Sequence, residues 1–193
     1  MSKYSCVILA SQSERRKQLL TATGVVFETL TPEVEEINIG RYFRHIPLIN
    51  AVLKAHAVSI DNSEALVIGA DTVIEFNNQS IGKPKNFEDS RRILGLLSGQ
   101  RHFVSTAVCL RCRELDAEIR FVETSEVEFK SFGAATIEQY LSKVFTLDKA
   151  GAYNIDEYGD LLINQVKGNI DNIIGLPCVK LLRALHSIQA LKY

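Results

Sequence analysis

Near the N-terminus the sequence reads Val7-Ile8-Leu9-Ala10-Ser11-Gln12-Ser13-Glu14-Arg15-Arg16, where a short apolar run gives way to hydroxyls, a carboxylate and two arginines. The apolar run is typical of a buried strand, and Lys17-Gln18-Leu19-Leu20 continues with the spacing of a helix. Backbone N–H groups at a helix start lack partners and carry partial positive charge. The stretch therefore predicts a strand, a loop and a helix, with Ser11, Ser13, Arg15 and Arg16 suited to hold a phosphate.

A simpler interpretation of these ten residues stays open. Ser11 and Glu14, three residues apart, match a capping box, in which two side chains satisfy backbone N–H groups at the helix start. The arginines are then ordinary solvated side chains. The stretch alone does not separate an anion site from a capped surface helix.

Composition favours a globular protein and argues against a nucleic-acid binder. The 193 residues are 46% hydrophobic, which is enough for a sizeable core in one domain or two joined lobes. The formal charge of −1 leaves no surplus for a broad basic face. Residues 1–5 lack a signal-peptide core, and no apolar run reaches the roughly 20 residues of a membrane span. We expect a cytoplasmic protein with neither nucleic-acid nor membrane partners.

The four cysteines are too scattered for a disulfide framework. Cys109 and Cys112 form a single C-x-x-C within a predicted strand, where positions three apart point to opposite faces. Reduced thiols are therefore favoured over a structural zinc site.

Hairpins with interleaved helices along the chain indicate an α/β or α+β fold with a mixed sheet. Helical spacing predicts a helix from Pro47 to about residue 60, with Lys54 on its flank. The continuous apolar run 65–70 is typical of a strand buried on both faces, and Asp71 follows at once. A carboxylate there is costly to desolvate unless it is paired or used, so Asp71 is the most telling acid of the chain.

Acids and cations suited to phosphate chemistry are spread along the sequence, whereas the P-loop, zinc-ligand and serine-hydrolase patterns are absent. The alternative for Asp71 is a structural contact with backbone or a lysine, and for each lysine it is a solvated surface position. The dispersed set is Glu36, Asp71 and Asp148, with Arg15, Arg16, Lys54, Lys83 and Lys149.

Six short motifs follow one another along nearly the whole chain. They are Leu9-Ala10-Ser11-Gln12-Ser13-Glu14-Arg15-Arg16, Gly69-Ala70-Asp71-Thr72, Gly82-Lys83-Pro84, Leu97-Ser98-Gly99-x-x-His102 with Ser105-Thr106-Ala107-Val108, Asp148-Lys149-Ala150-Gly151-Ala152-Tyr153, and Asn172-Ile173-Ile174-Gly175-Leu176-Pro177. In order and spacing this set resembles the Maf nucleotide pyrophosphatases. Each motif alone is weak, but six in order are hard to obtain otherwise.

The resemblance implies a fold, an activity and a cofactor. The fold is α/β (mixed α+β) and like that of the inosine triphosphatases, with an elongated mixed sheet and helices in one domain, residues 1–193, whose two lobes flank a central cleft. The activity is hydrolysis of a nucleoside triphosphate to the monophosphate and pyrophosphate with Mg²⁺ or Mn²⁺. The resemblance is also compatible with a homodimer.

Site residues are carried over from the family by position. Asp71 corresponds to the general base for water attack on the α-phosphorus, and Glu36 and Lys83 to further catalytic residues. The resemblance also implies Glu36 and Asp71 as the metal ligands. The phosphate-binding set is Ser11, Arg15, Arg16, Lys54 and Lys83, and the specificity set is Arg15, Thr72 and Asp156.

Two residues depart from the family pattern. Glu14 stands where proline is usual, which places an acid beside the phosphate-binding arginines. Arg15 and Thr72 match the branch that prefers dTTP and UTP, but that branch has glutamine where this chain has Asp156. Because a carboxylate lacks the amide donor, the pyrimidine preference is in question at this position.

Two other functions remain as alternatives. One is a nucleotide-binding regulator of cell division or septum formation that does not require hydrolysis. The other is an α/β nucleotidyltransferase that uses the same basic loop and transfers the nucleotide to an acceptor.

Overall fold

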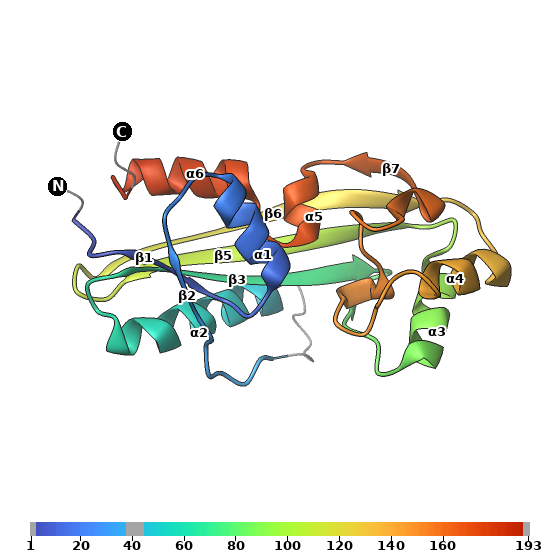
Figure 1. Ribbon diagram of the computed structural model, residues 1–193, viewed down its shortest axis with the longest axis horizontal. Coiled ribbons are helices and arrows are strands. Elements are labelled where there is room, and N and C mark those ends of the chain that lie inside the picture. Colours follow the sequence, from blue (N-terminus) through green and yellow to red (C-terminus); the bar gives the residue numbers. More distant parts are fainter. Residues whose placement is uncertain (1–2, 38–44, 191–193) are drawn as a thin grey trace. The chain divides into compact units, whose positions relative to one another are not determined.

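The computed structural model describes residues 3–37 and 45–190, and the elements lie within these ranges (Figure 1). The strands are β1 (Val7–Ala10), β2 (Glu28–Leu30), β3 (Leu66–Phe76), β4 (Gln79–Ile81), β5 (Arg101–Cys112), β6 (Ala117–Phe129) and β7 (Ile163–Lys167). The helices are α1 (Glu14–Ala22), α2 (Ile46–Asp61), α3 (Phe87–Leu97), α4 (Ala134–Leu141), α5 (Ile170–Ile174) and α6 (Cys178–Ser187), with short 3₁₀ turns at Ala150–Ala152 and Gly159–Leu161.

The strands form a mixed sheet in the order β2-β1-β3-β5-β6-β7, with β4 paired to β3. Strand β1 is parallel to both β2 and β3, and its last residue, Ala10, lies opposite Gly69. The pairs β3–β4 and β6–β7 are antiparallel. The predicted mixed sheet with interleaved helices is therefore confirmed.

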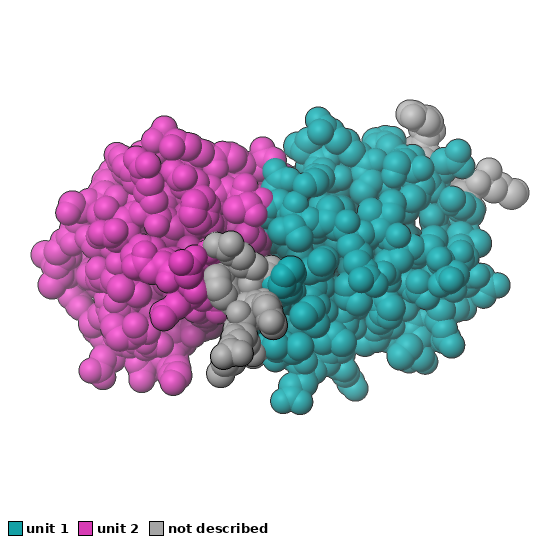
Figure 2. Space-filling view, turned by 180° about the vertical axis from the view of Figure 1, so that it is seen from behind, with its two compact units in different colours: residues 1–71, 106–123, 175–193 teal, residues 72–105, 124–174 magenta. Residues whose placement is uncertain are grey.

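The chain divides into two compact units (Figure 2). The first comprises residues 1–71, 106–123 and 175–193, and the second residues 72–105 and 124–174. Strands β3, β5 and β6 contribute residues to both units. The expected single domain with two lobes around a central cleft stays a prediction.

In the first unit the sheet is buried on both faces. Alternating residues of β1 and β3 enter two separate apolar clusters, because successive side chains of a strand point to opposite faces. Helices α1 and α6 pack on one face and α2 on the other (Figure 1). Cys109 belongs to one cluster and Cys112 to the other, so the predicted opposite orientation of these two thiols is confirmed.

Helix α2 approaches β3 closely because residue 69 is glycine. A Cβ atom there would lie 2.2 Å from the carbonyl oxygen of Ala51 and 2.7 Å from the amide nitrogen of Ala55. Both distances are far below van der Waals contact, so any side chain would push the helix off the strand. The second unit has its own core, in which α3 and α4 pack on β3 and β6.

The start of α1 differs from the capping box that the sequence offered. The N-cap is Ser13, whose Oγ accepts a hydrogen bond from the amide of Arg16, and Ser11 Oγ accepts from the amide of Ser13. The strand ends at Ala10, which leaves room for both serines before the helix begins. The Ser11–Glu14 capping box is therefore wrong.

No helix in the described part of the chain has the length and apolar character needed to span a bilayer.

Candidate active site

Asp71 lies in the first unit, beyond the point where the pairing of β1 and β3 ends. The β3 residues from Leu66 to Ala70 are buried, and Asp71 itself is only 9% exposed. The apolar run before Asp71 places β3 inside the unit. Because the pairing with β1 ends at Gly69, the Asp71 carboxylate lies just beyond the end of β1. Such a carboxylate needs partners, and the structure supplies them.

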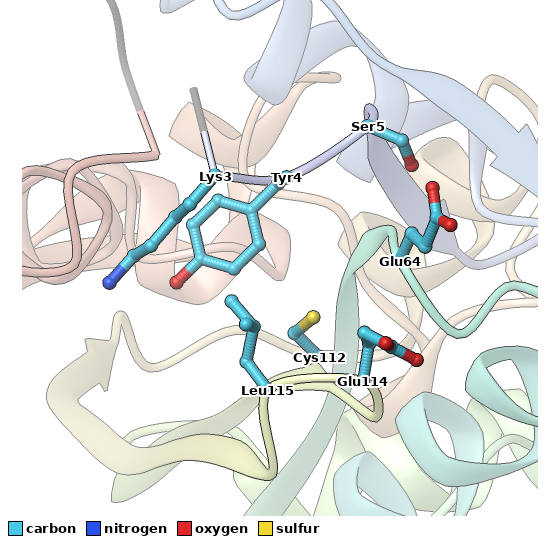
Figure 3. A pocket seen from close by; sticks show the side chains of 7 residues that line it. All are labelled: Lys3, Tyr4, Ser5, Glu64, Cys112, Glu114 and Leu115. Atoms are coloured by element: carbon cyan, nitrogen blue, oxygen red, sulfur yellow. The ribbon is translucent and has the colours of Figure 1, made fainter. Parts of the chain in front are cut away.

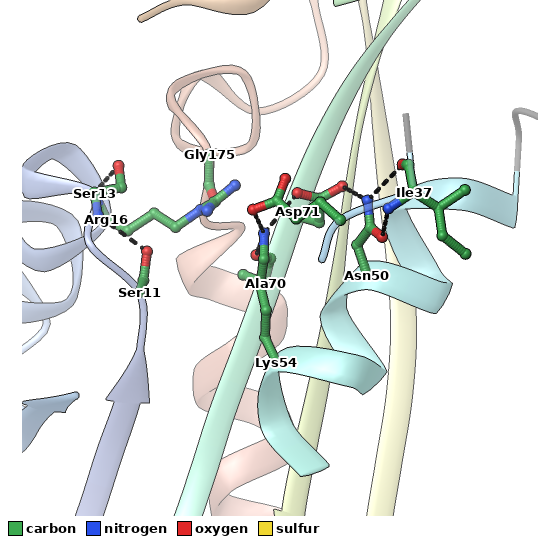
Figure 4. Close-up of polar contacts among 10 residues, drawn as sticks. Ser11, Ser13, Arg16, Ile37, Asn50, Lys54, Ala70, Asp71 and Gly175 are labelled. Carbon is green, nitrogen blue, oxygen red and sulfur yellow. Dashed lines mark hydrogen bonds and ion pairs between the residues drawn. The ribbon is translucent and has the colours of Figure 1, made fainter. Parts of the chain in front are cut away.

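Lys54 is the cationic partner of Asp71 (Figure 4). Its Nζ donates to Asp71 Oδ1 at 2.8 Å and to the carbonyl oxygen of Ala70 at 3.4 Å, and it lies 2.9 Å from Oε1 of Glu36. Lys54 is 5% exposed, because α2 packs directly on the sheet at Gly69. One ammonium therefore neutralises two carboxylates, one buried and one, Glu36, still 43% exposed at its side chain.

Asn50 holds the other oxygen of Asp71, and sequence reasoning did not find it. Its Nδ2 donates to Asp71 Oδ2 at 3.1 Å and to the carbonyl oxygen of Ile37 at 3.0 Å, while its Oδ1 accepts from the Ile37 amide at 2.9 Å. Asn50 precedes Lys54 by one helical turn, so both face the sheet. An amide inside the apolar stripe of this helix was the available signal.

Arg16 brings a second cation to the first unit. Its Nε donates to the carbonyl oxygen of Gly175 at 2.8 Å, and its side chain points toward the Asp71 group (Figure 4). Burial lowers the pKa of the Arg16 guanidinium, and the negative charges of Asp71 and Glu36 oppose this shift. Arginine remains charged in proteins, so this is a partly dehydrated cation beside two carboxylates.

The neighbours of Arg16 in the first turn of α1 are also charged. Arg15 is half-buried, and its positive charge contributes to the lowered pKa of Arg16. Glu14 is mostly exposed, and its Oε1 lies 3.8 Å from Nζ of Lys17. This contact gives the unusual acid a cationic partner of its own, away from the two arginines.

Three of the predicted residues fall in the second unit. Thr72 directly follows Asp71 in β3 and is half-buried. Lys83 is exposed in the loop after β4, where the Gly82 carbonyl accepts from the Gly151 amide at 3.1 Å. Asp156 is exposed, and its amide donates to Asn154 Oδ1 at 3.3 Å. A joint action of Lys83 and Asp156 with the first-unit cluster stays a prediction.

Lys149, another cation of the set identified in the sequence, makes contacts within its own turn. It is buried, and its Nζ donates to the Phe145 carbonyl at 2.7 Å and to Asp148 Oδ1 at 2.8 Å. These contacts tie together the turn that carries it.

The chemistry of Glu36 and Asp71 suits a hard divalent cation. Both offer carboxylate oxygens, and both already face one positive charge, the Lys54 ammonium. Mg²⁺ commonly takes one or two protein carboxylates and completes its shell with water and substrate phosphate. Within residues 3–37 and 45–190 no group of three or more His, Cys, Asp or Glu side chains is arranged to hold a metal ion.

A separate cavity of about 340 Å³ lies in the first unit (Figure 3). As far as the described residues go, its lining includes none of the predicted site residues. It mixes an ammonium, two carboxylates, a phenol and a thiol, and so lacks the concentration of cations that a triphosphate requires. The lining residues are Lys3, Tyr4, Ser5, Glu64, Cys112, Glu114 and Leu115.

Comparison with known proteins identifies the family and agrees with the fold. The family described as Maf-like protein matches residues 6–188. A dTTP/UTP pyrophosphatase of Dictyoglomus thermophilum is 40% identical over 177 residues, covering 91% of this chain and 92% of that protein. A dTTP/UTP pyrophosphatase of Bacillus cereus (strain ZK / E33L) is 38% identical over 181 residues, covering 93% of each.

Among solved structures, the Ham1 protein of Staphylococcus aureus superposes with a TM-score of 0.51 at 16% identity, covering 94% of this chain and 97% of that one. At this identity the likeness concerns the fold alone, and it agrees with the inosine-triphosphatase-like fold expected from the sequence. The match to the family and the two relatives go further, because each extends over most of the chain. This chain is a member of the Maf-like protein family.

Proposed function

We propose that this protein hydrolyses nucleoside triphosphates to the monophosphate and pyrophosphate, with dTTP and UTP as favoured substrates. The buried Lys54–Asp71 ion pair supports this function most directly, with Arg16 beside it and the parallel pairing of β1 and β3 ending just before Asp71. The names of the two relatives, dTTP/UTP pyrophosphatase, support the substrate class. The cytoplasm, the compartment expected from the sequence, is where we place the reaction.

In this mechanism Asp71 is the general base. Its carboxylate accepts a proton from the water that attacks the α-phosphorus, the bond from the α-phosphorus to the bridging oxygen breaks, and pyrophosphate leaves. Lys54 and Asn50 each occupy one carboxylate oxygen, but every such oxygen has a second lone pair that can accept from water. The two contacts thus orient the base without blocking it.

Cations on three elements bind the phosphates. Arg15 and Arg16 come from α1, Lys54 from α2 and Lys83 from the loop after β4, while Ser11 offers a hydroxyl. Glu36 and Asp71 are the residues that would hold a divalent cation, Mg²⁺ or Mn²⁺, which would neutralise phosphate charge and acidify water. The Lys54 ammonium faces both carboxylates and balances part of their negative charge.

Base preference rests on Arg15, Thr72 and Asp156. The exposed carboxylate of Asp156 accepts hydrogen bonds and does not donate them, whereas a pyrimidine carbonyl needs a donor. We therefore expect Asp156→Gln to improve turnover of dTTP and UTP relative to purine triphosphates.

A panel of ordinary and modified triphosphates, assayed with Mg²⁺ or Mn²⁺ and with product identification, tests the function. The expected products are equal amounts of monophosphate and pyrophosphate from at least one substrate. Diphosphate with orthophosphate, or no turnover of any substrate, would contradict the proposal.

The same panel on Asp156→Gln tests the specificity residue, with Asp160→Asn, another exposed acid of the second unit, as the matched control. If dTTP and UTP gain nothing over the control, Asp156 does not set the preference.

A further inference from the structure

The side-chain amide of Asn50 has every strong hydrogen-bonding group engaged, although it is only 2% exposed. Its two N–H donors reach the Ile37 carbonyl and Asp71 Oδ2, and its oxygen accepts from the Ile37 amide. The reverse orientation of the amide would place its oxygen against a carbonyl and a carboxylate, and its N–H groups against an N–H. The orientation is therefore fixed by its partners.

The contacts of Asn50 join α2 to two other parts of the first unit, strand β3 at Asp71 and the backbone at Ile37. Ile37 belongs to an irregular segment, residues 31–37, and receives from Asn50 the two-bond pairing that a neighbouring strand would give it. The residue just before Ile37 is Glu36, whose carboxylate shares Lys54 with Asp71. Asn50 thus fixes one carboxylate directly and the backbone beside the other.

We infer that Asn50 is a positioning residue for the hydrolysis proposed above: it orients the Asp71 carboxylate and tethers the segment that carries Glu36. The inference rests on the proposed function for its kinetic consequences, but the tether itself is a property of the free protein. A buried amide that makes three contacts can set the angle of a carboxylate, which a lysine on a flexible stem does less well.

Two substitutions separate the two roles of Asn50, which are orienting Asp71 and tethering the segment that carries Glu36. Asn50→Leu removes all three hydrogen bonds. Asn50→Asp keeps the oxygen that accepts from the Ile37 amide but places a second carboxylate against Asp71, so it disturbs the base more than the tether. Asn62→Leu is the matched control, because Asn62 lies at the far end of α2 and its Nδ2 bonds the Val58 carbonyl at 2.8 Å.

The kinetic test compares kcat and KM on a triphosphate that the native protein turns over. Asn50→Leu is expected to lower kcat about 10-fold or more and to leave KM within about 3-fold, as for loss of a residue that orients a reacting group. Asn50→Asp is expected to lower kcat at least as much, because it places a second carboxylate against the oxygen of Asp71 that Asn50 now holds.

Amide hydrogen exchange of Ile37, followed by NMR without nucleotide, gives a readout independent of activity. Exchange is expected to accelerate in Asn50→Leu and to stay slow in Asn50→Asp and Asn62→Leu. Native kcat in both Asn50 variants, or equal losses in Asn50→Leu and Asn62→Leu, would overturn the inference. If the native protein turns over no triphosphate, the proposed function fails, and unchanged Ile37 exchange in Asn50→Leu would refute the tether separately.

Discussion

The ammonium nitrogen of Lys54 lies 2.8 Å from Oδ1 of Asp71, and both residues are buried. A buried ion pair adds less stability than its short distance suggests, because both charges lose their hydration. Removing one partner is costly, however, since the other charge is then left buried. The pair therefore makes function and stability depend on the same two residues, and variants can separate the two effects.

Asp71→Asn is expected to lower kcat by about 10²-fold or more, because an amide cannot accept the proton of the attacking water. Folding persists at a cost of about 1 to 3 kcal/mol, because the new amide N–H faces the Asn50 donor, while Glu36 still pairs with the buried Lys54 ammonium. Steady-state kinetics with a nucleotide-binding assay measures both effects. Unchanged kcat would remove Asp71 from the mechanism, whereas a protein that acts only by binding nucleotide would keep its function in this variant.

The matched control for that substitution is Asp61→Asn. Asp61 is an exposed residue at the end of α2, so the same chemical change there tests the loss of a negative charge without touching the base. We expect native kcat. A similar loss in both variants would show that the effect of Asp71→Asn is not local.

Lys54→Met is expected to destabilise the fold by about 3 kcal/mol, because it removes the ammonium that Asp71 and Glu36 share. Lys180→Met is the control: its exposed ammonium lies 3.3 Å from Glu123, and its loss is expected to cost less than about 1 kcal/mol. Chemical denaturation at neutral pH measures the two free energies of unfolding. Equal losses of unfolding free energy would mean that the burial of Lys54 does not increase the cost of removing its charge.

Alanine substitution at two glycines is expected to act in opposite directions. Gly69→Ala places a methyl group 2.2 Å from the Ala51 carbonyl oxygen and is expected to destabilise the protein by about 2 to 4 kcal/mol. Gly95 lies inside α3 with no atom within 4 Å of an added Cβ, so Gly95→Ala is expected to gain about 0.5 to 1 kcal/mol. Thermal unfolding of both variants measures these changes in stability. Unchanged stability in Gly69→Ala would contradict the close approach of α2.

Stability is expected to fall below about pH 6.5 through His102. Burial lowers the pKa of this imidazole from its ordinary 6.5 to about 4, so the unfolded chain binds a proton in this range that the native protein does not. Stability therefore rises with pH between about 4 and 6.5, by about 3 kcal/mol in all.

Denaturation from pH 4 to 7 measures this slope in the native protein and in His102→Gln. The glutamine amide can keep a hydrogen bond to the Tyr153 hydroxyl, which lies 2.9 Å from His102 Nε2. The slope is expected to flatten in this variant, and His186→Gln, at an exposed position of α6, is the control. An equally steep slope in His102→Gln would assign the effect to other groups.

Sequence patterns predict a helix cap or a turn correctly where the residues that form it are neighbours in the chain. Asn86, which precedes the apolar set of α3, caps that helix by accepting from the Asp89 amide at 2.8 Å, and the turn-forming pair Asn77 and Asn78 makes the hairpin turn with positive φ. Thr136 and Gln139 match a capping box in the sequence, but α4 begins two residues earlier, at Ala134 after Gly133, so that interpretation is wrong. Ser98 Oγ bonds both the amide and the carbonyl of Phe132, and this distant contact fixes where that helix starts.

The site was predicted only as far as its residues carry charge or belong to a motif. Asp71, Lys54 and Glu36 are acids and bases, and the structure brings these three together. Asn50 has neither signal, since a single amide in an apolar helix has no partner that the sequence identifies. Its partner is the backbone of Ile37, thirteen residues away in an irregular segment, and only the tertiary structure reveals that pairing.

The alignment of Ala10 with Gly69 between β1 and β3 makes strand register a condition of catalysis. Side chains alternate between the faces of a strand, so a slip of β3 by one residue would turn Asp71 away from α2. The position facing Lys54 would then hold Ala70 or Thr72, neither of which has a carboxylate. A register shift of one residue would thus leave a sheet that still forms its hydrogen bonds but lacks the proposed general base, Asp71, at this position.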